Sequence, residues 1–324
     1  MKKSWLFLLL LILAITQSIA QRKQVAILIF DGVQIIDYTG PYEVLGQAGF
    51  NVFTVAQRKT QIITSMGMKV VPNYDFSDMP DAEIMVLPGG RVPHSVPESD
   101  STVVWIKKVA DRAECILSVC NGAFWLTSAR LLDGKEATTT AGMISHLNMF
   151  SPDTKPVYDR RFVESGKIVT TGGLSAGIDG ALHIVSKIHG VGRAQEVANN
   201  MEYNWQKGDG YVRTQLADFP FSGALDFNPP LRNRETLQYR GSDREWIAEY
   251  KVPRQETLSE FYTQFATAAG NSGWKKVEEE RLIGVHSIWE KTDFAGRKWR
   301  CEVQLENTVE KGIIYFKLQN TLVQ

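Results

Sequence analysis

Residues 115–123 have the sequence CILSVCNGA, in which an apolar run ends at Cys120 and a glycine follows two residues later. A continuous apolar run is typical of a strand buried on both faces of a parallel sheet. A strand that turns sharply into a helix is the geometry of a nucleophile elbow, here with Cys120 at the turn. The free N–H groups at the start of that helix favour the thiolate, so we expect a depressed pKa for Cys120. The spacing alone leaves open that Cys120 is a small buried apolar residue.

Strand-like and helix-like segments alternate on both sides of this turn. Strands are expected at 25–30, 50–55, 83–87, 115–119 and 167–170, and helices at 42–48, 101–112, 122–131, 175–188 and 192–205. The first helix is expected to start at Thr39, Gly40 and Pro41, because proline is favoured in a first helical turn. Buried strands that alternate with helices predict an α/β fold with a doubly wound, mostly parallel sheet flanked by helices, of the flavodoxin-like kind.

The chain changes character after this α/β domain, which we place at residues 21–206. Residues 207–254 are rich in Gly, Pro, Asn and charge, and are expected to be a linker or extension with one strand at Trp246–Val252. Residues 255–324 are expected to form a small α+β domain of unknown role. It would contain a helix at 255–269 and strands at 274–278, 285–291, 298–305 and 313–318.

The first 20 residues have the pattern of a secretory signal peptide. Lys2 and Lys3 precede the apolar run Trp5–Ile15, and the small residues Ser18 and Ala20 precede the expected cleavage site. The apolar run is too short to span a bilayer, which disfavours an uncleaved anchor. We therefore expect an exported protein, periplasmic or secreted, with no membrane association after cleavage.

Composition and spacing disfavour several kinds of partner. Without residues 1–20 the chain carries 34 Lys and Arg against 36 Asp and Glu, and no basic cluster indicates nucleic-acid binding. Five histidines without ligand-like spacing predict no metal site. The glycines at 172, 173 and 177 match neither the dinucleotide fingerprint nor the P-loop, so no cofactor is expected.

The chain has three cysteines, Cys115, Cys120 and Cys301. An odd number leaves at least one free thiol in a monomer. Cys115 and Cys120 share a predicted strand, and five residues of strand span roughly 16 Å, too far for a disulfide. Pairing of Cys115 with Cys301 stays open.

Five segments resemble, in the same order, the ThiJ/PfpI superfamily of the class I glutamine amidotransferase-like fold. They are FDGVQIIDYTGPYEVL at 30–45, LPGG at 87–90, SVCNGAFWL at 118–126, LLDGKEATT at 131–139 and GGLSAGIDGALHIV at 172–185. The similarity covers about residues 24–205 and is closest to the branch of isonitrile hydratases and AraC-type regulator sensor domains. It implies a small-molecule substrate or ligand and a homodimer.

The resemblance also implies roles for individual residues. Cys120 would be the nucleophile, and Asp37 the acid that approaches its sulfur and relays a proton. The backbone N–H groups of Gly90 and Asn121 would form an oxyanion hole. For Asp37 the alternative is a plain helix-terminal acid that favours the dipole, with Thr39 free to act as the cap.

Four further residues are candidates for the pocket: Gly89, His94, Thr140 and Asp179. His94 follows the Gly-Gly loop, and Asp179 is expected in a first helical turn, where an exposed position is the alternative. Asn121 stands where the peptidase branch of the superfamily has histidine, so an adjacent Cys-His dyad is absent.

Three functions follow from these residues. The first is an exported Cys-dependent hydratase or hydrolase that acts on a small electrophile such as an isonitrile, an aldehyde adduct or an amide, with Asp37 as acid/base partner of Cys120. The second is a non-catalytic module that binds or senses a small ligand. The third is a redox or stress-response protein in which Cys120 is oxidised to a sulfenic or sulfinic acid.

Overall fold

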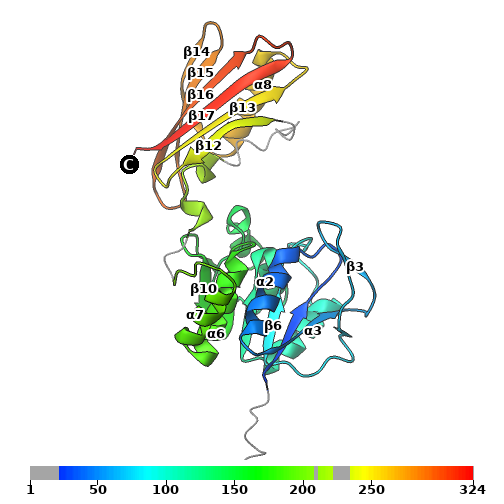
Figure 1. Ribbon diagram of the computed structural model, residues 1–324. Helices are drawn as coiled ribbons and strands as arrows, with labels where there is room; N and C mark the ends of the chain where they lie inside the picture. The colour runs from blue at the N-terminus through cyan, green and yellow to red at the C-terminus, as the bar shows by residue number, and fades with distance from the viewer. Residues whose placement is uncertain (1–21, 208–210, 222–233, 324) are drawn as a thin grey trace, which may run out of the picture. The chain divides into compact units, whose positions relative to one another are not determined.

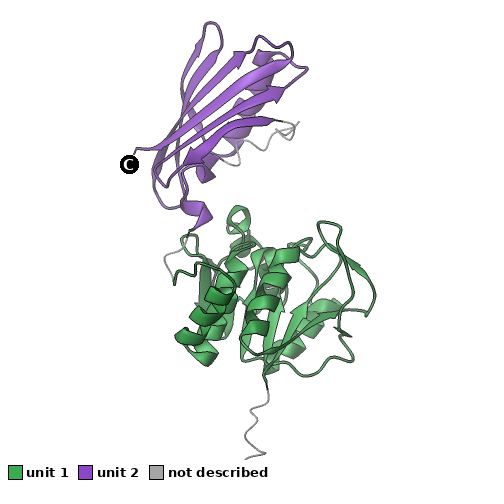
Figure 2. Cartoon of the chain, in the orientation of Figure 1, with its two compact units in different colours: residues 1–211 green, residues 212–324 purple. Residues whose placement is uncertain are grey.

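The computed structural model describes residues 22–207, 211–221 and 234–323. The chain forms two compact units, residues 1–211 and 212–324 (Figure 2). The predicted signal peptide lies outside the described residues. Within them, no helix is long and apolar enough to cross a membrane.

The first unit is built on a seven-stranded sheet with the order β10-β11-β7-β6-β1-β2-β5 (Figure 1). Its strands are β1 (Gln24–Leu28), β2 (Asn51–Ala56), β5 (Tyr74–Asp75), β6 (Ile84–Leu87), β7 (Cys115–Ser118), β10 (Phe162–Ser165) and β11 (Ile168–Thr171). Only the edge pair β10 and β11 is antiparallel. The prediction of a mostly parallel sheet is therefore confirmed.

Helices cover both faces of this sheet. They are α2 (Ile35–Gln47), α3 (Ser101–Arg112), α4 (Ala123–Ser128), α5 (His146–Phe150), α6 (Ala176–His189) and α7 (Val191–Asn200). Val25 and Ile27 of β1 pack into one apolar core with α2, α6 and α7, whereas Ala26 and Leu28 pack into a second core with α3 and α4. Successive strand residues thus serve opposite faces, which confirms the doubly wound architecture.

The start of helix α2 corrects one prediction. The helix begins at Ile35, so Pro41 lies inside it rather than in its first turn, and the Thr39 hydroxyl donates to the Ile35 carbonyl at 2.9 Å. The chain enters the helix early because the Gln34 N–H donates to the carbonyl of Gly89 at 2.9 Å, across the end of the sheet. This earlier start places Asp37 in the first turn.

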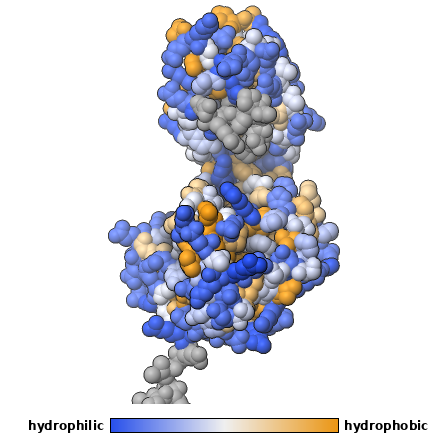
Figure 3. All heavy atoms as spheres, turned by 90° about the vertical axis from the view of Figure 1, so that its right-hand side faces the viewer, coloured by the Kyte–Doolittle hydropathy of each residue, from blue (hydrophilic) through white to orange (hydrophobic). Residues whose placement is uncertain are grey.

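A small hairpin of β3 (Ile62–Ile63) and β4 (Lys69–Val70) lies between β2 and β5 in the chain. Backbone N–H groups of Gly32 and Ser65 join the hairpin to the loop before α2. Its outward side chains are apolar and exposed, and apolar patches mark this face of the domain (Figure 3). They are Ile63, Met66, Met68 and Val71.

The second unit is a six-stranded antiparallel sheet with the order β12-β13-β17-β16-β15-β14 and one helix. Its elements are β12 (Glu235–Gly241), β13 (Glu245–Pro253), α8 (Leu258–Asn271), β14 (Lys275–Arg281), β15 (Val285–Thr292), β16 (Lys298–Asn307) and β17 (Ile313–Leu322). Helix α8 packs on the sheet through Phe261, Phe265 and Ala269. The prediction that the C-terminal part forms a small α+β domain is therefore confirmed.

The boundary of this domain differs from the predicted one. The segment 207–254, expected to be a linker, contributes strands β12 and β13 to the sheet, and the unit starts at Val212. Strand β13 pairs along its whole length with β17, the last strand of the chain, and buries Ala248, Tyr250 and Val252. A pairing between segments this far apart leaves little trace in the local composition of either.

Candidate active site

Cys120 stands at a strained turn directly after β7. Its φ is +57°, a left-handed conformation that is rare for a residue with a side chain. The turn is held on both sides, because the Cys120 N–H donates to the Gly172 carbonyl at 3.1 Å and the Thr139 hydroxyl donates to the Cys120 carbonyl at 2.6 Å. The nucleophile-elbow geometry is confirmed. The half-buried Cys120 side chain lies at the carboxyl end of the central strand β7.

The elbow lies one strand away from the point, between β1 and β6, where the sheet changes its direction of winding. From β1 the chain proceeds to β2 and β5 on one side, and to β6, β7 and β11 on the other. Loops after the carboxyl ends of such strands diverge and leave a crevice, which is the usual ligand site of open α/β sheets. The segments that follow β1, β6, β7 and β11 carry, respectively, Asp37 (in the first turn of α2), Gly89, Cys120 and Gly173.

Asp37 is fully buried beside the cysteine. Its Oδ2 accepts the N–H of Gly89 at 3.2 Å, its Oδ1 accepts the N–H of Leu174 at 3.1 Å, and its carboxyl lies close enough to Cys120 for each group to shift the pKa of the other. Three loops therefore position one carboxyl group against one sulfur. A plain helix-terminal acid would be solvated, so the alternative considered for Asp37 does not describe this residue.

The charges of the two groups are coupled. Burial raises the pKa of Asp37 to about 6, even though two backbone N–H groups favour its ionised form. Burial, and then the adjacent Asp37 charge, raise the pKa of Cys120 to about 12. The depressed pKa expected for Cys120 is wrong, because the Asn121 N–H and the Thr140 hydroxyl, which both lower it, are outweighed. Between these two values the pair holds a single proton.

Asn121 and Gly90 form a reciprocal pair. The Gly90 N–H donates to Asn121 Oδ1, and Asn121 Nδ2 donates to the Gly90 carbonyl, both at 2.8 Å. The predicted oxyanion hole needed the N–H groups of both residues, but that of Gly90 is already engaged. The Asn121 N–H does approach the Cys120 sulfur. The prediction that the Gly90 N–H forms part of an oxyanion hole is therefore corrected, because this N–H bonds Asn121 instead.

Two glycines allow the loops to approach the sulfur closely. A Cβ on Gly89 would lie 2.3 Å from Asn121 Oδ1, 2.8 Å from Cys120 Cβ and 2.9 Å from Asp37 Oδ2, so no larger residue fits there. A Cβ on Gly173 would lie 3.3 Å from Cys120 Sγ and 3.2 Å from Thr140 Oγ1. Gly89 and Thr140, both predicted for the pocket, are therefore at the site.

The other two pocket candidates have different surroundings. Asp179 is buried and pairs with Arg161 and with the Tyr203 hydroxyl, so the exposed position considered for it is wrong. His94 stacks on His146 with ring centroids 5.6 Å apart. No described contact joins either residue to the Cys120 sulfur.

Leu174 is a site residue that the sequence pattern did not indicate. It lies next to Gly173 in the segment GGLSAG after β11. Leu174 has a φ of +56°, which turns its N–H toward Asp37. All three cysteines are free, so the pairing of Cys115 with Cys301 is not formed.

Comparison with known proteins places this arrangement in a family. A model of the DJ-1/PfpI family matches residues 23–187. The chain belongs to the DJ-1/PfpI family. The resemblance noted in the sequence is thereby confirmed, and the second unit lies outside the matched residues.

Relatives within the DJ-1/PfpI family include several enzymes. Isonitrile hydratase of Pseudomonas putida is 35% identical over 181 residues, which cover 56% of this chain and 78% of that protein. A deglycase of Thermococcus kodakarensis is 29% identical, covering 36% of this chain and 72% of the deglycase. The crystal structure of a ThiJ/PfpI family protein from Pseudomonas syringae superposes with a TM-score of 0.53 at 28% identity, covering 57% of this chain and 77% of that one.

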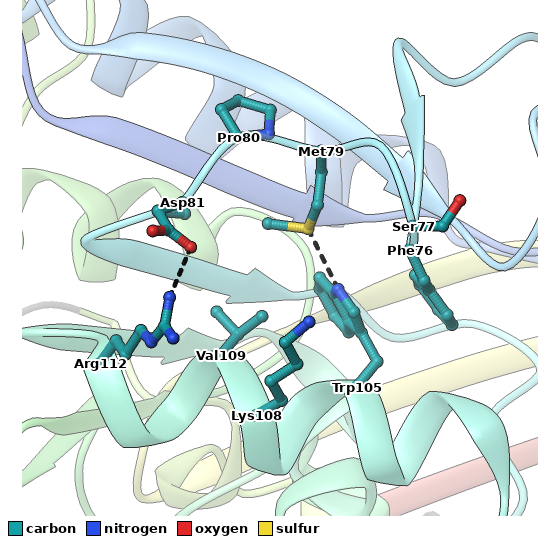
Figure 4. Close-up of a pocket in the computed structure, with 10 residues that line it drawn as sticks. Phe76, Ser77, Met79, Pro80, Asp81, Trp105, Lys108, Val109 and Arg112 are labelled. Carbon is teal, nitrogen blue, oxygen red and sulfur yellow. Dashed lines mark hydrogen bonds and ion pairs between the residues drawn. The ribbon is translucent and has the colours of Figure 1, made fainter.

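A separate small cavity of the DJ-1/PfpI domain lies between α3 and the segment that leads into β6 (Figure 4). Trp105 stacks on Phe76 with centroids 4.7 Å apart and donates to Met79 Sδ at 3.1 Å, while Arg112 pairs with Asp81. Phe76, Met79 and Asp81 precede β6, and Trp105 and Arg112 lie on α3, which precedes β7, whereas the elbow follows the carboxyl end of β7. The cavity is therefore distinct from the Cys120 site.

No metal site was found among the described residues, since they contain no group of three or more His, Cys, Asp or Glu placed to hold an ion. The expectation that this DJ-1/PfpI protein uses neither metal nor cofactor stays a prediction.

The raised pKa of Asp37 makes the stability of the DJ-1/PfpI domain depend on pH. Folding raises this pKa from 3.8 to about 6, so the folded state binds the proton more tightly than the unfolded state. Protonation of Asp37 therefore stabilises the folded domain, fully below about pH 4. This contribution is lost as the pH rises through about 6, which lowers the free energy of unfolding by about 3 kcal/mol. Denaturant unfolding of the wild type and Asp37→Asn between pH 4 and 7.5 measures it as the difference between the two proteins. Identical pH dependence in both would contradict the assignment.

A methyl group on Gly173 is expected to block the site without unfolding the domain. In Gly173→Ala the new Cβ would lie slightly closer to Cys120 Sγ and Thr140 Oγ1 than ordinary contact allows, so we expect alkylation of Cys120 by iodoacetamide to slow by about 10-fold and Tm to fall by a few degrees. Gly172→Ala is the matched control, because its Cβ would meet only Ala176 Cβ at 3.5 Å and two backbone oxygens farther away. Equal rates in the two variants would show that the space beside Gly173 is not the approach to Cys120.

Proposed function

We propose that this protein is a Cys120-dependent hydratase of small electrophilic molecules, with isonitriles as the first substrate class to test. The observation that carries the proposal is the buried Asp37 carboxyl beside Cys120 at the elbow, where Cys120 Cβ and Asp37 Oδ2 converge on the same position next to Gly89. Similarity to a hydratase and a deglycase supports a role for this site in addition chemistry.

The first step uses the single proton that the pair holds near neutral pH. The Cys120 sulfur attacks the terminal carbon of the isonitrile as thiolate while Asp37 holds the proton. A carbon–sulfur bond forms, and the Asp37 proton moves to the same carbon. The product is a thioimidate on Cys120, and Asp37 is left as a carboxylate.

The second step adds water to the thioimidate. Asp37 takes a proton from the attacking water and delivers it to the nitrogen, so that carbon carries hydroxyl, amine and sulfur. The hydroxyl proton then passes to Asp37 as the carbonyl forms, and the carbon–sulfur bond breaks to release a formamide. The Asn121 N–H and the Thr140 hydroxyl stabilise the departing thiolate, since both favour the charged form of Cys120.

The direct test is formamide formation from a small alkyl isonitrile. The full-length mature protein is incubated with the isonitrile, and the N-alkyl formamide is quantified by NMR. We expect product in proportion to protein concentration and none after alkylation of Cys120. A correctly folded protein that forms no formamide would refute the isonitrile assignment.

One observation favours the second function, ligand binding without turnover. Burial raises the pKa of Cys120, which makes its thiol a weaker nucleophile near neutral pH than an exposed one. A Cys120→Ser variant with unchanged affinity for a small ligand, in a protein without turnover, would support this function. The redox alternative is tested by mass spectrometry after mild peroxide, and an unmodified Cys120 would dispose of it.

We also propose that the protein is exported and acts as a homodimer. The N-terminal pattern supports the first of these, and the family resemblance supports the second. A mature N-terminus at Gln21 would establish cleavage of the signal peptide, and light scattering would give the oligomeric state. Retention of Met1, or a monomer at all concentrations, would contradict the respective proposal.

A further inference from the structure

The side chain of Asn121 is fully committed to the backbone of Gly90. Asn121 is buried, and its amide oxygen and nitrogen bond the N–H and carbonyl of this one residue, both at 2.8 Å. The orientation of the amide is fixed, because exchanging its oxygen and nitrogen would set donor against donor and acceptor against acceptor. The Gly90 N–H is therefore engaged by a partner that water or substrate must displace.

Other contacts already hold the Gly90 backbone in place. Val33 and Gly90 form a β-bridge, the Gln34 N–H donates to the Gly89 carbonyl at 2.9 Å, and the Arg91 N–H donates to the Gly32 carbonyl at 3.0 Å. The loop is thus pinned on both sides of Gly90 without Asn121. What the Asn121 side chain adds is occupation of the Gly90 N–H.

The amide oxygen that occupies this N–H lies beside the reacting centre. Asn121 Oδ1, Cys120 Cβ and Asp37 Oδ2 all converge on the empty position beside the Cα of Gly89, at 2.3, 2.8 and 2.9 Å. Two neighbouring backbone donors are also engaged, because the N–H groups of Gly89 and Leu174 bond Asp37. Side chains thus occupy three backbone donors around the sulfur.

We propose that Asn121 is a specificity-determining residue that withholds the Gly90 N–H from substrate and so directs Cys120 away from acyl substrates such as esters and amides. The proposal rests on the proposed function, and narrows its substrate class to electrophiles whose addition creates no oxyanion. Isonitriles belong to this class.

The distinction follows from where charge develops. When a thiolate attacks an ester carbonyl, the carbon–sulfur bond forms and the carbonyl π electrons become an alkoxide, which collapses as the leaving alkoxide departs. That oxyanion needs preorganised donors, and loss of one donor typically costs about 10²- to 10³-fold in rate. Hydration of an isonitrile passes through a neutral adduct with hydroxyl, amine and sulfur on one carbon, so it gains little from such donors.

The test compares two reactions of Cys120 in the same protein. Acetylation by p-nitrophenyl acetate forms an oxyanion and releases p-nitrophenolate, whereas alkylation by iodoacetamide is a displacement that forms none. Asn121→Ala frees the Gly90 N–H, so we expect the ratio of acetylation to alkylation rates to rise at least about 10-fold. A smaller rise, or an equal rise in both rates, overturns the proposal.

Two further measurements keep the test decisive. Asn121→Ser, whose side chain is too short to bond both Gly90 groups, should give the same rise if Asn121→Ala does not fold. The ratio of acetylation to alkylation rates is also measured for wild-type Cys120 and for free N-acetylcysteine. The wild-type ratio should be less than about 100-fold larger than that of N-acetylcysteine, and a larger excess overturns the proposal. Because neither reaction uses an isonitrile, a failure of the formamide assay refutes the proposed function and leaves this result to be judged separately.

Discussion

Replacing Cys120 by serine is expected to reduce formamide formation from an isonitrile by at least about 10³-fold. Loss of a nucleophile that acts together with its base removes nearly all the catalysis of such a unit. The serine hydroxyl has a far higher intrinsic pKa than the thiol, and the neighbouring Asp37 carboxylate raises it further, as it does for Cys120. The measurement is the steady-state rate of N-alkyl formamide production by NMR.

Cys115→Ala is the matched control for this variant. Cys115 lies at the start of the same strand and is buried, and its thiol is free. Its removal should leave kcat within about threefold of the wild type and cost some stability through a small cavity. Comparable losses of rate in Cys115→Ala and Cys120→Ser would show that the strand, not the sulfur at the elbow, is what activity requires.

Replacing Asp37 by asparagine is expected to lower kcat/KM by about 10² to 10⁴-fold, the usual contribution of a positioned general acid–base group. Asparagine keeps the size of the side chain but cannot donate and recover a proton. Its amide nitrogen would also face the N–H groups of Gly89 or Leu174, where the carboxylate accepts hydrogen bonds. A residual rate within tenfold of the wild type would exclude Asp37 as the proton carrier.

The pH profile distinguishes a chemical role of Asp37 from a structural one. In the wild type, kcat/KM should rise as the pH increases through about 6, because the pair passes from two protons to the reactive one-proton form. Asp37→Asn should lack this limb. Asp111→Asn, an exposed acid on α3, should keep the wild-type profile. The same limb in all three proteins would assign the titration to another group.

Most of the first domain follows from periodicity. The strand at residues 115–119 and the turn at Cys120 were predicted from an apolar run followed by a small residue and a helix, and the structure has β7 and a φ of +57° there. The start of α2 was predicted wrongly because proline was taken as a first-turn signal. A hydrogen bond from Gln34 to the distant Gly89 set that boundary instead.

In the second domain, local sequence patterns did not predict which segments belong to the sheet. Residues 245–253 alternate in burial as a strand should, and one strand was expected there, yet composition assigned the whole segment to a linker. Its membership in the sheet depends on pairing with β17, about 70 residues later in the chain. Such pairing is decided by packing of the complete sheet against α8, which no window of sequence contains.

The position of the elbow could be predicted from the sequence alone, since an apolar strand followed by a turn and a helix is a local pattern, although bonds to Thr139 and Gly172 hold the turn. The nine residues CILSVCNGA predict both which cysteine stands at the turn and that it follows the end of a buried strand. Tertiary structure decided the chemistry around it. Asp37 bonds the N–H groups of residues 52 and 137 positions away, and Asn121 bonds one 31 positions away. These contacts bury the sulfur, raise its pKa rather than lower it, and occupy the Gly90 donor, because they depend on how loops from four strands meet above one sheet.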